Sequence, residues 1–196
     1  MKTHAHKSKV SRASVLSAAL KNRPIKSNVI RARVLALALK NDEVQRFALA
    51  GGSQSATADD KLSDLFAIGG LLGSYLHHPD WMRNHLRRIY GFTTGWLMLL
   101  GVKAPIIVID AERNRQEELL CQGKFLFTCA SQVASANRKF RVLAEEIGEV
   151  AEAIDKLEMA EAELSSEIRQ HQQHLITELF QVAAVAVAWL ESLEAK

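Results

Sequence analysis

Hydrophobic residues recur along this chain three or four positions apart, which is the spacing of an α-helix. Only the short run 105–109 departs from this pattern towards strict alternation. The pattern therefore predicts an all-α protein. We expect helices over residues 10–21, 28–49, 59–77, 80–100, 110–122, 136–160 and 165–194.

The longest apolar stretch, residues 92–109, is interrupted by Lys103 and Pro105 and falls short of a membrane-spanning helix. We expect a buried helix there, followed by a short extended piece over 105–109. The apolar segment 13–20 is too short for a secretory signal. These features predict a cytoplasmic protein with no membrane contact.

A change in composition near residues 101–105 predicts a domain boundary. Upstream lies a helical N-terminal region, 1–104, and downstream a second domain, 105–196. Residues 1–50 carry 11 basic and 2 acidic side chains, whereas residues 151–196 carry 3 basic and 9 acidic ones. A basic N-terminal arm of this kind is suited to contacts with phosphates or nucleic acid. A solvated chain end is the simpler interpretation.

Composition excludes several classes of protein. Hydrophobic residues make up 48% of the 196 residues, so the chain is neither disordered nor collagen-like. Cys121 and Cys129 are its two cysteines, which excludes a disulfide-stapled domain and indicates reduced thiols.

Two similar segments carry the candidate chemistry. Residues 143–150 and 175–182 both read L-x-x-E-[IL]-x-[EQ]-V. In each helix the acidic or amide positions flank an apolar stripe, so an antiparallel hairpin would bring four polar side chains together. The stripes are Leu143, Ile147, Val150, Ile154 and Leu157 in the first helix, and Leu175, Leu179, Val182, Ala186, Trp189 and Leu193 in the second.

Converging carboxylates repel one another and need a cation or protons. Oxygen ligands without Cys or His favour Mg²⁺ or Mn²⁺, ions that commonly act on phosphates. The alternative is that these acids form solvated helix faces. His171 and His174 stand three positions apart, but we interpret them as surface residues.

Glu145-Glu146-x-x-Glu149 followed by Glu178-x-x-Gln181 resembles the EExxE…ExxD signature of MazG-like nucleoside triphosphate pyrophosphohydrolases. The resemblance covers residues 107–194. It implies an all-α hairpin that completes a four-helix bundle by forming a homodimer or homotetramer. It also implies hydrolysis of a nucleoside or deoxynucleoside triphosphate to the monophosphate and pyrophosphate.

The resemblance also implies roles for individual residues. Glu146, Glu149, Glu178 and Gln181 would hold Mg²⁺ or Mn²⁺, although Gln181 stands where the common motif has Asp. Glu145, with Glu149, would serve catalysis by supporting the site or orienting the attacking water. For the nucleotide we expect contacts from Arg115, Gln116 and Phe125 to the base, and from Lys139 to a phosphate.

Two other functions remain open at this point. The bundle could be a non-catalytic dimerisation module whose basic N-terminal half binds nucleic acid or a protein partner. A di-iron carboxylate bundle would need Glu-x-x-His pairs, which neither helix of the hairpin supplies. The Ala-rich run 182–189 is apolar on more than one face, so we expect it to be buried at an interface between copies.

Overall fold

The computed structural model describes residues 42–195, with side chains from residue 45 onward. All of its regular secondary structure is helical, and none of the described residues forms a strand, so the all-α prediction is confirmed. The helices are α3 (Asp42–Gly51), α4 (Ala58–Ser74), α5 (Pro79–Leu99), α6 (Pro105–Cys121), α7 (Ala136–Ala162) and α8 (Ile168–Glu194). The basic arm, the predicted helix 10–21 and most of 28–49 lie outside the described residues.

Helix ends follow local chemistry. Thr57 caps α4 by accepting from the Asp60 amide while the Asp60 carboxylate accepts from the Thr57 amide, a reciprocal capping box. Ser135 caps α7 by accepting a hydrogen bond from the Arg138 amide. Gly123, with a φ of +71°, follows the end of α6 in the left-handed region that glycine tolerates best.

The predicted extended piece over 105–109 is wrong, because these residues form the first turns of α6. Pro105 stands at the start of the helix, where its fixed φ is helical and its missing N–H removes no hydrogen bond. Ile109 is buried, whereas Ile107 is 70% exposed. Residues two positions apart share a face in a strand, so the different exposure of Ile107 and Ile109 agrees with a helix.

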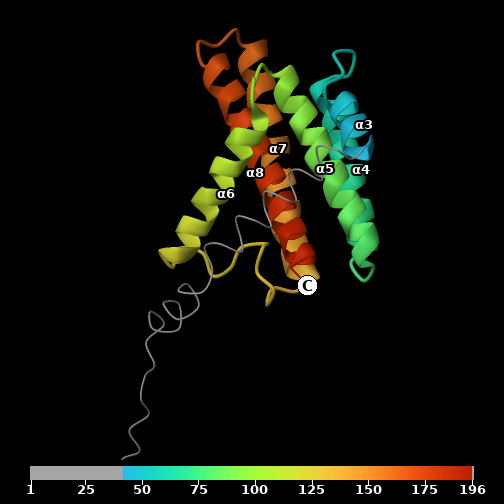
Figure 1. Cartoon of the computed structure of the whole chain (residues 1–196). Coiled ribbons are helices and arrows are strands. Elements are labelled where there is room, and N and C mark those ends of the chain that lie inside the picture. Colours follow the sequence, from blue (N-terminus) through green and yellow to red (C-terminus); the bar gives the residue numbers. More distant parts are fainter. Residues whose placement is uncertain (1–41, 196) are drawn as a thin grey trace, which may run out of the picture.

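Helices α7 and α8 form the predicted antiparallel hairpin, joined by residues 163–167 (Figure 1). Four of the five stripe residues of α7 are buried, and Leu157 is partly buried. All six stripe residues of α8 are buried. The two predicted apolar faces are thus confirmed as parts of the core.

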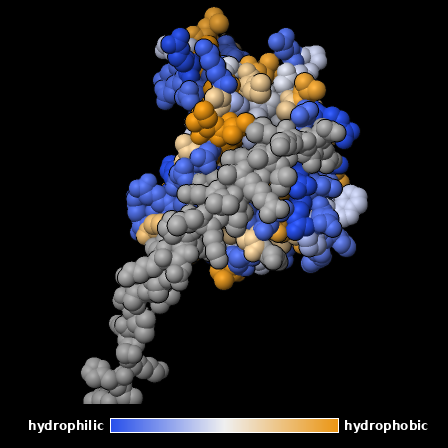
Figure 2. All heavy atoms as spheres, in the orientation of Figure 1, coloured by the Kyte–Doolittle hydropathy of each residue, from blue (hydrophilic) through white to orange (hydrophobic). Residues whose placement is uncertain are grey.

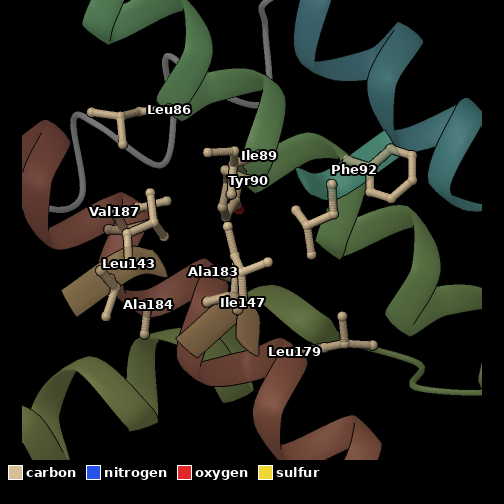
Figure 3. Close-up of a cluster of buried hydrophobic side chains, with 14 of the residues drawn as sticks. Leu86, Ile89, Tyr90, Phe92, Leu143, Ile147, Leu179, Ala183, Ala184 and Val187 are labelled. Carbon is tan, nitrogen blue, oxygen red and sulfur yellow. The ribbon is translucent and has the colours of Figure 1, made fainter. Parts of the chain in front are cut away.

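Helix α8 is enclosed within a single chain, because α5, α6 and α7 all pack against it (Figure 1). Figure 3 shows Ile89 and Tyr90 of α5 gathered with Ile147 of α7 and Ala183 of α8. The run 182–189 is covered in this way, which corrects the expectation that it forms an interface between copies. The apolar face of α5 covers this run, so no second copy is needed to bury it.

The boundary predicted at 101–105 falls in the turn between α5 and α6, and one hydrophobic cluster includes helices from both sides of it.

Within the described residues, α8 is the one helix that is long and apolar enough to span a membrane. In its most apolar window, 89% of the residues are buried inside the protein, as in the core helix of a soluble protein. Hydrophilic residues are prominent on the face drawn in Figure 2, with hydrophobic residues in separate groups.

Candidate metal and nucleotide site

Three glutamates from the α7–α8 hairpin converge. One oxygen each of Glu146, Glu149 and Glu178 lies within 4.8 Å of the others. Glu146 and Glu149 are one turn apart on α7, and the packing of the two apolar stripes sets Glu178 of α8 opposite them. The sequence predicted this convergence, and the structure brings these three side chains together.

Glu146 is the carboxylate of this group whose pKa is most affected by burial and by its acidic neighbours. Its Oε2 atom is buried and has no hydrogen-bond partner among the described residues. Burial, followed by the charges of Glu149, Glu178, Glu112 and Glu145, raises the pKa of Glu146 to about 8. Glu146 therefore needs either a proton or a nearby positive charge to be stable in this position.

Glu178 is held from both sides by residues of its own helix. The Nδ1 atom of His174 lies 3.1 Å from Oε1 of Glu178, and the amide nitrogen of Gln181 donates to Oε2. Burial and the Glu149 charge raise the pKa of Glu178, while His174 and Gln181 act against that rise. Gln181, a predicted metal ligand, is therefore engaged here through its nitrogen in holding Glu178.

A cavity of about 400 Å³ opens beside the three glutamates. It lies between α6, the start of the α6–α7 connection, and the α7–α8 hairpin. Seven of the predicted site residues line it, Gln181 among them. Its lining consists of Arg115, Gln116, Lys124, Phe125, Leu126, Phe127, Thr128, Cys129, Val142, Glu145, Glu146, Glu149, Gln181 and Val185.

Charges and rings line the exposed rim of this cavity. Arg115 pairs with Glu112 through two hydrogen bonds of 2.6 and 2.7 Å, and it lies within the electrostatic reach of Glu146. Phe125 is 39% exposed, and Lys124 is exposed as well. Phe127 instead lies under the guanidinium of Arg138, whose central carbon is 4.1 Å from the ring centre.

Gln116 and Thr128 line the floor of the cavity, and a network of buried polar side chains lies behind them. Arg113 is completely buried and donates to Gln116, to Glu117 of the same helix and to Glu191 of α8, at 2.8, 2.8 and 3.1 Å. Thr128, from the connection, donates to Glu117 at 3.4 Å. This network fixes the floor of the cavity to α8.

Lys139 does not reach the cavity. Its side chain is buried, and its ammonium group donates to the Ser192 hydroxyl at 2.6 Å. Two turns of α7 separate it from Glu146, about 10 Å along the axis. At that level the antiparallel α8 presents its C-terminal end, so Lys139 ties the two helices together and lies apart from the predicted phosphate position.

Sequence reasoning missed several residues of the site. The sequence suggests a surface residue at His174, yet its position four residues before Glu178 places it on the same helix face. Glu112 was recognisable by the same rule, three residues before Arg115. Lys124 stands next to Phe125, a predicted base contact, but was given no role of its own, and Thr128 gave no signal, since it lies in the irregular connection.

Comparison with known proteins adds no family to these observations, because no family model, curated protein or solved structure matches the chain.

Proposed function

We propose that this protein is a metal-dependent pyrophosphohydrolase that converts a nucleoside or deoxynucleoside triphosphate to the monophosphate and pyrophosphate. One observation carries the proposal: three converging glutamates adjoin a cavity that also has cationic and aromatic residues at its rim. The resemblance of their spacing to the signature of MazG-like enzymes supports the same reaction.

The donor set fits a hard divalent cation. Glu146, Glu149 and Glu178 offer only oxygen, and the buried Oε2 of Glu146 has no hydrogen-bond partner among the described residues. Three carboxylates do not distinguish Mg²⁺ from Mn²⁺, and we propose that either ion binds here. When bound, such an ion would supply positive charge for phosphate oxygens and lower the pKa of water.

The remaining residues would orient the nucleotide. Lys124 presents a cationic group where the cavity meets solvent, which suits phosphates that keep part of their hydration. Arg115, which we predict to contact the base, lines the same cavity and is paired with Glu112. Phe125 offers a ring for stacking on the base. Glu145 is exposed at the same rim and can accept a proton from the attacking water. His174 and Gln181 keep Glu178 in place.

We further propose that the active form is a homodimer or homotetramer, in which copies meet through surfaces other than the buried run 182–189. Ile107 of α6 and Leu126 of the connection are 70% and 78% exposed, and contact between copies would cover such side chains. Light scattering coupled to gel filtration tests this proposal. A mass of one chain at all concentrations would contradict it.

Pyrophosphate release from a panel of ribo- and deoxyribonucleoside triphosphates, with Mg²⁺ or Mn²⁺, tests the activity. We expect metal-dependent turnover that Glu149→Gln reduces by at least about 100-fold. Glu158→Gln is the matched control, because Glu158 is exposed on the same helix and lies outside the cavity. Absence of turnover with every nucleotide, together with melting unaffected by metal, would refute the enzyme and favour the non-catalytic dimerisation module.

A further inference from the structure

The amide of Gln116 has its orientation fixed by its two neighbours. Its Oε1 accepts from Arg113, a side chain that can only donate, at 2.8 Å. Its Nε2 donates to the carboxylate of Glu112, which can only accept, at 3.3 Å. Both contacts demand the same orientation, so a flipped amide would lose both. The second N–H of Gln116 remains for a ligand in the cavity that Gln116 lines.

Thr128 offers the opposite polarity in the same cavity. Its hydroxyl donates to Glu117 at 3.4 Å, which leaves the oxygen able to accept from another partner. Gln116 and Glu117 are adjacent in α6, and Arg113 bonds to both of them. Arg113 thus fixes Gln116 as a donor on the cavity floor and, through Glu117, favours Thr128 as an acceptor there.

This floor suits the uncharged end of a nucleotide. Gln116, Thr128 and Cys129 are 7%, 5% and 3% exposed, whereas Lys124, Glu145 and Glu149 at the rim are exposed. Removing phosphates from water onto this floor is unfavourable, because none of the described residues there offers a free cation. The phosphates therefore belong at the rim beside the glutamates, and the base belongs on the floor.

Resting on the proposed function, we infer that the site selects bases whose edge carries a carbonyl next to a ring N–H. The Gln116 amide donates to the carbonyl, and the Thr128 oxygen accepts from the ring N–H. Hypoxanthine, guanine, uracil and thymine have this edge. Adenine and cytosine present an amino group next to a bare ring nitrogen, which places donor against donor and acceptor against acceptor. A buried polar pair left unmatched in this way reduces binding by about 10- to 100-fold.

The test compares pairs that differ at this edge: inosine with adenosine triphosphate, and uridine with cytidine triphosphate, each with Mg²⁺. We expect kcat/KM to be about 10- to 100-fold higher for the first member of each pair, with the difference in KM. Gln116→Met, which keeps the volume but removes the donor, should bring both ratios close to one. Gln122→Met, at the exposed end of the same helix, should leave both ratios unchanged. Thr128→Val gives an independent variant should Gln116→Met fail to fold.

Binding separates this inference from the proposed activity. Thermal shifts are measured with the α,β-methylene analogues of guanosine and adenosine triphosphate, which cannot be cleaved at that bond. A larger shift with the guanosine analogue that disappears in Gln116→Met supports the inference even where no nucleotide is hydrolysed. Hydrolysis with ratios near one, or in favour of the amino bases, overturns the inference while the proposed function stands. Failure of both analogues to bind overturns the inference as well.

Discussion

Replacing Glu146 by glutamine should stabilise the protein in the absence of divalent metal. Burial and the neighbouring carboxylates raise the pKa of Glu146 from 4.5 to about 8. Because this folded-state pKa lies above that of the unfolded chain, the folded state holds an extra proton between these values. Stability therefore falls as the pH rises from about 4.5 to about 8, and it stays low above that range. Glutamine is neutral throughout and escapes this loss.

The size of the effect follows from the shift. At about 1.4 kcal/mol per pKa unit, the full shift corresponds to about 5 kcal/mol above pH 8. Glu146 is partly in contact with solvent, so less than half of this remains, about 2 kcal/mol. For a chain of this length that gain corresponds to a melting temperature about 4 to 8 °C higher. The new amide would also donate to the Glu149 and Glu178 carboxylates that face it.

Urea unfolding and thermal melting of the wild type and Glu146→Gln, at about pH 5 and about pH 8 with EDTA, measure this difference. We expect a clear gain at the higher pH and little gain at the lower one, where the folded wild type has Glu146 protonated. Millimolar Mg²⁺ should stabilise the wild type at the higher pH and have little effect on the variant. Glu158→Gln controls for removal of a charge from α7. A Glu146→Gln protein no more stable than the wild type at the higher pH in EDTA would refute the reasoning.

Three further predictions concern packing and burial. Arg113→Met removes a buried cation that donates to Glu191 and should cost about 3 to 5 kcal/mol in urea unfolding, part of which Arg113→Met/Glu191→Leu should recover; an additive loss in the double variant would contradict the pairing. Gly95→Ala should destabilise by about 1 to 3 kcal/mol, because its Cβ would lie 1.8 Å from the Ala48 carbonyl oxygen of α3, whereas Gly70→Ala meets no atom within 4 Å and should be neutral or stabilising. Burial raises the pKa of Cys129 to about 12, so iodoacetamide at about pH 8 should modify the exposed Cys121 and spare Cys129 until urea is added; mass spectrometry distinguishes the two.

Periodicity alone was sufficient to predict the hairpin and its glutamate cluster. The period of about 3.6 residues decides which side of a helix is buried, and a short turn forces neighbouring helices to be antiparallel. Once the stripes face each other, Glu146, Glu149 and Glu178 have little freedom to be anywhere else. Local geometry of this kind depends on few residues, and those residues are close in sequence.

Contacts between distant segments were beyond the same reasoning. The burial of Val187 depends on α5, about 90 residues earlier, and nothing in the repeat of α8 indicates which partner covers it. Lys139 illustrates the same limit on the scale of one side chain. Its position upstream of Glu145 suggested a phosphate contact, but its partner was decided by Ser192, which the hairpin brings from 53 positions away.

Glutamine at position 181 illustrates how sequence and structure together revise a chemical interpretation. From the sequence, Gln181 is a neutral replacement for an acidic ligand and so a loss of charge. In the structure its nitrogen donates to Glu178, a carboxylate that is already opposed by Glu149 and whose pKa is raised. A carboxylate at position 181 would add a further negative charge beside these groups and could not donate. The amide therefore reduces repulsion and holds Glu178 in place, so the absence of the acid is compatible with a site organised around the three remaining glutamates.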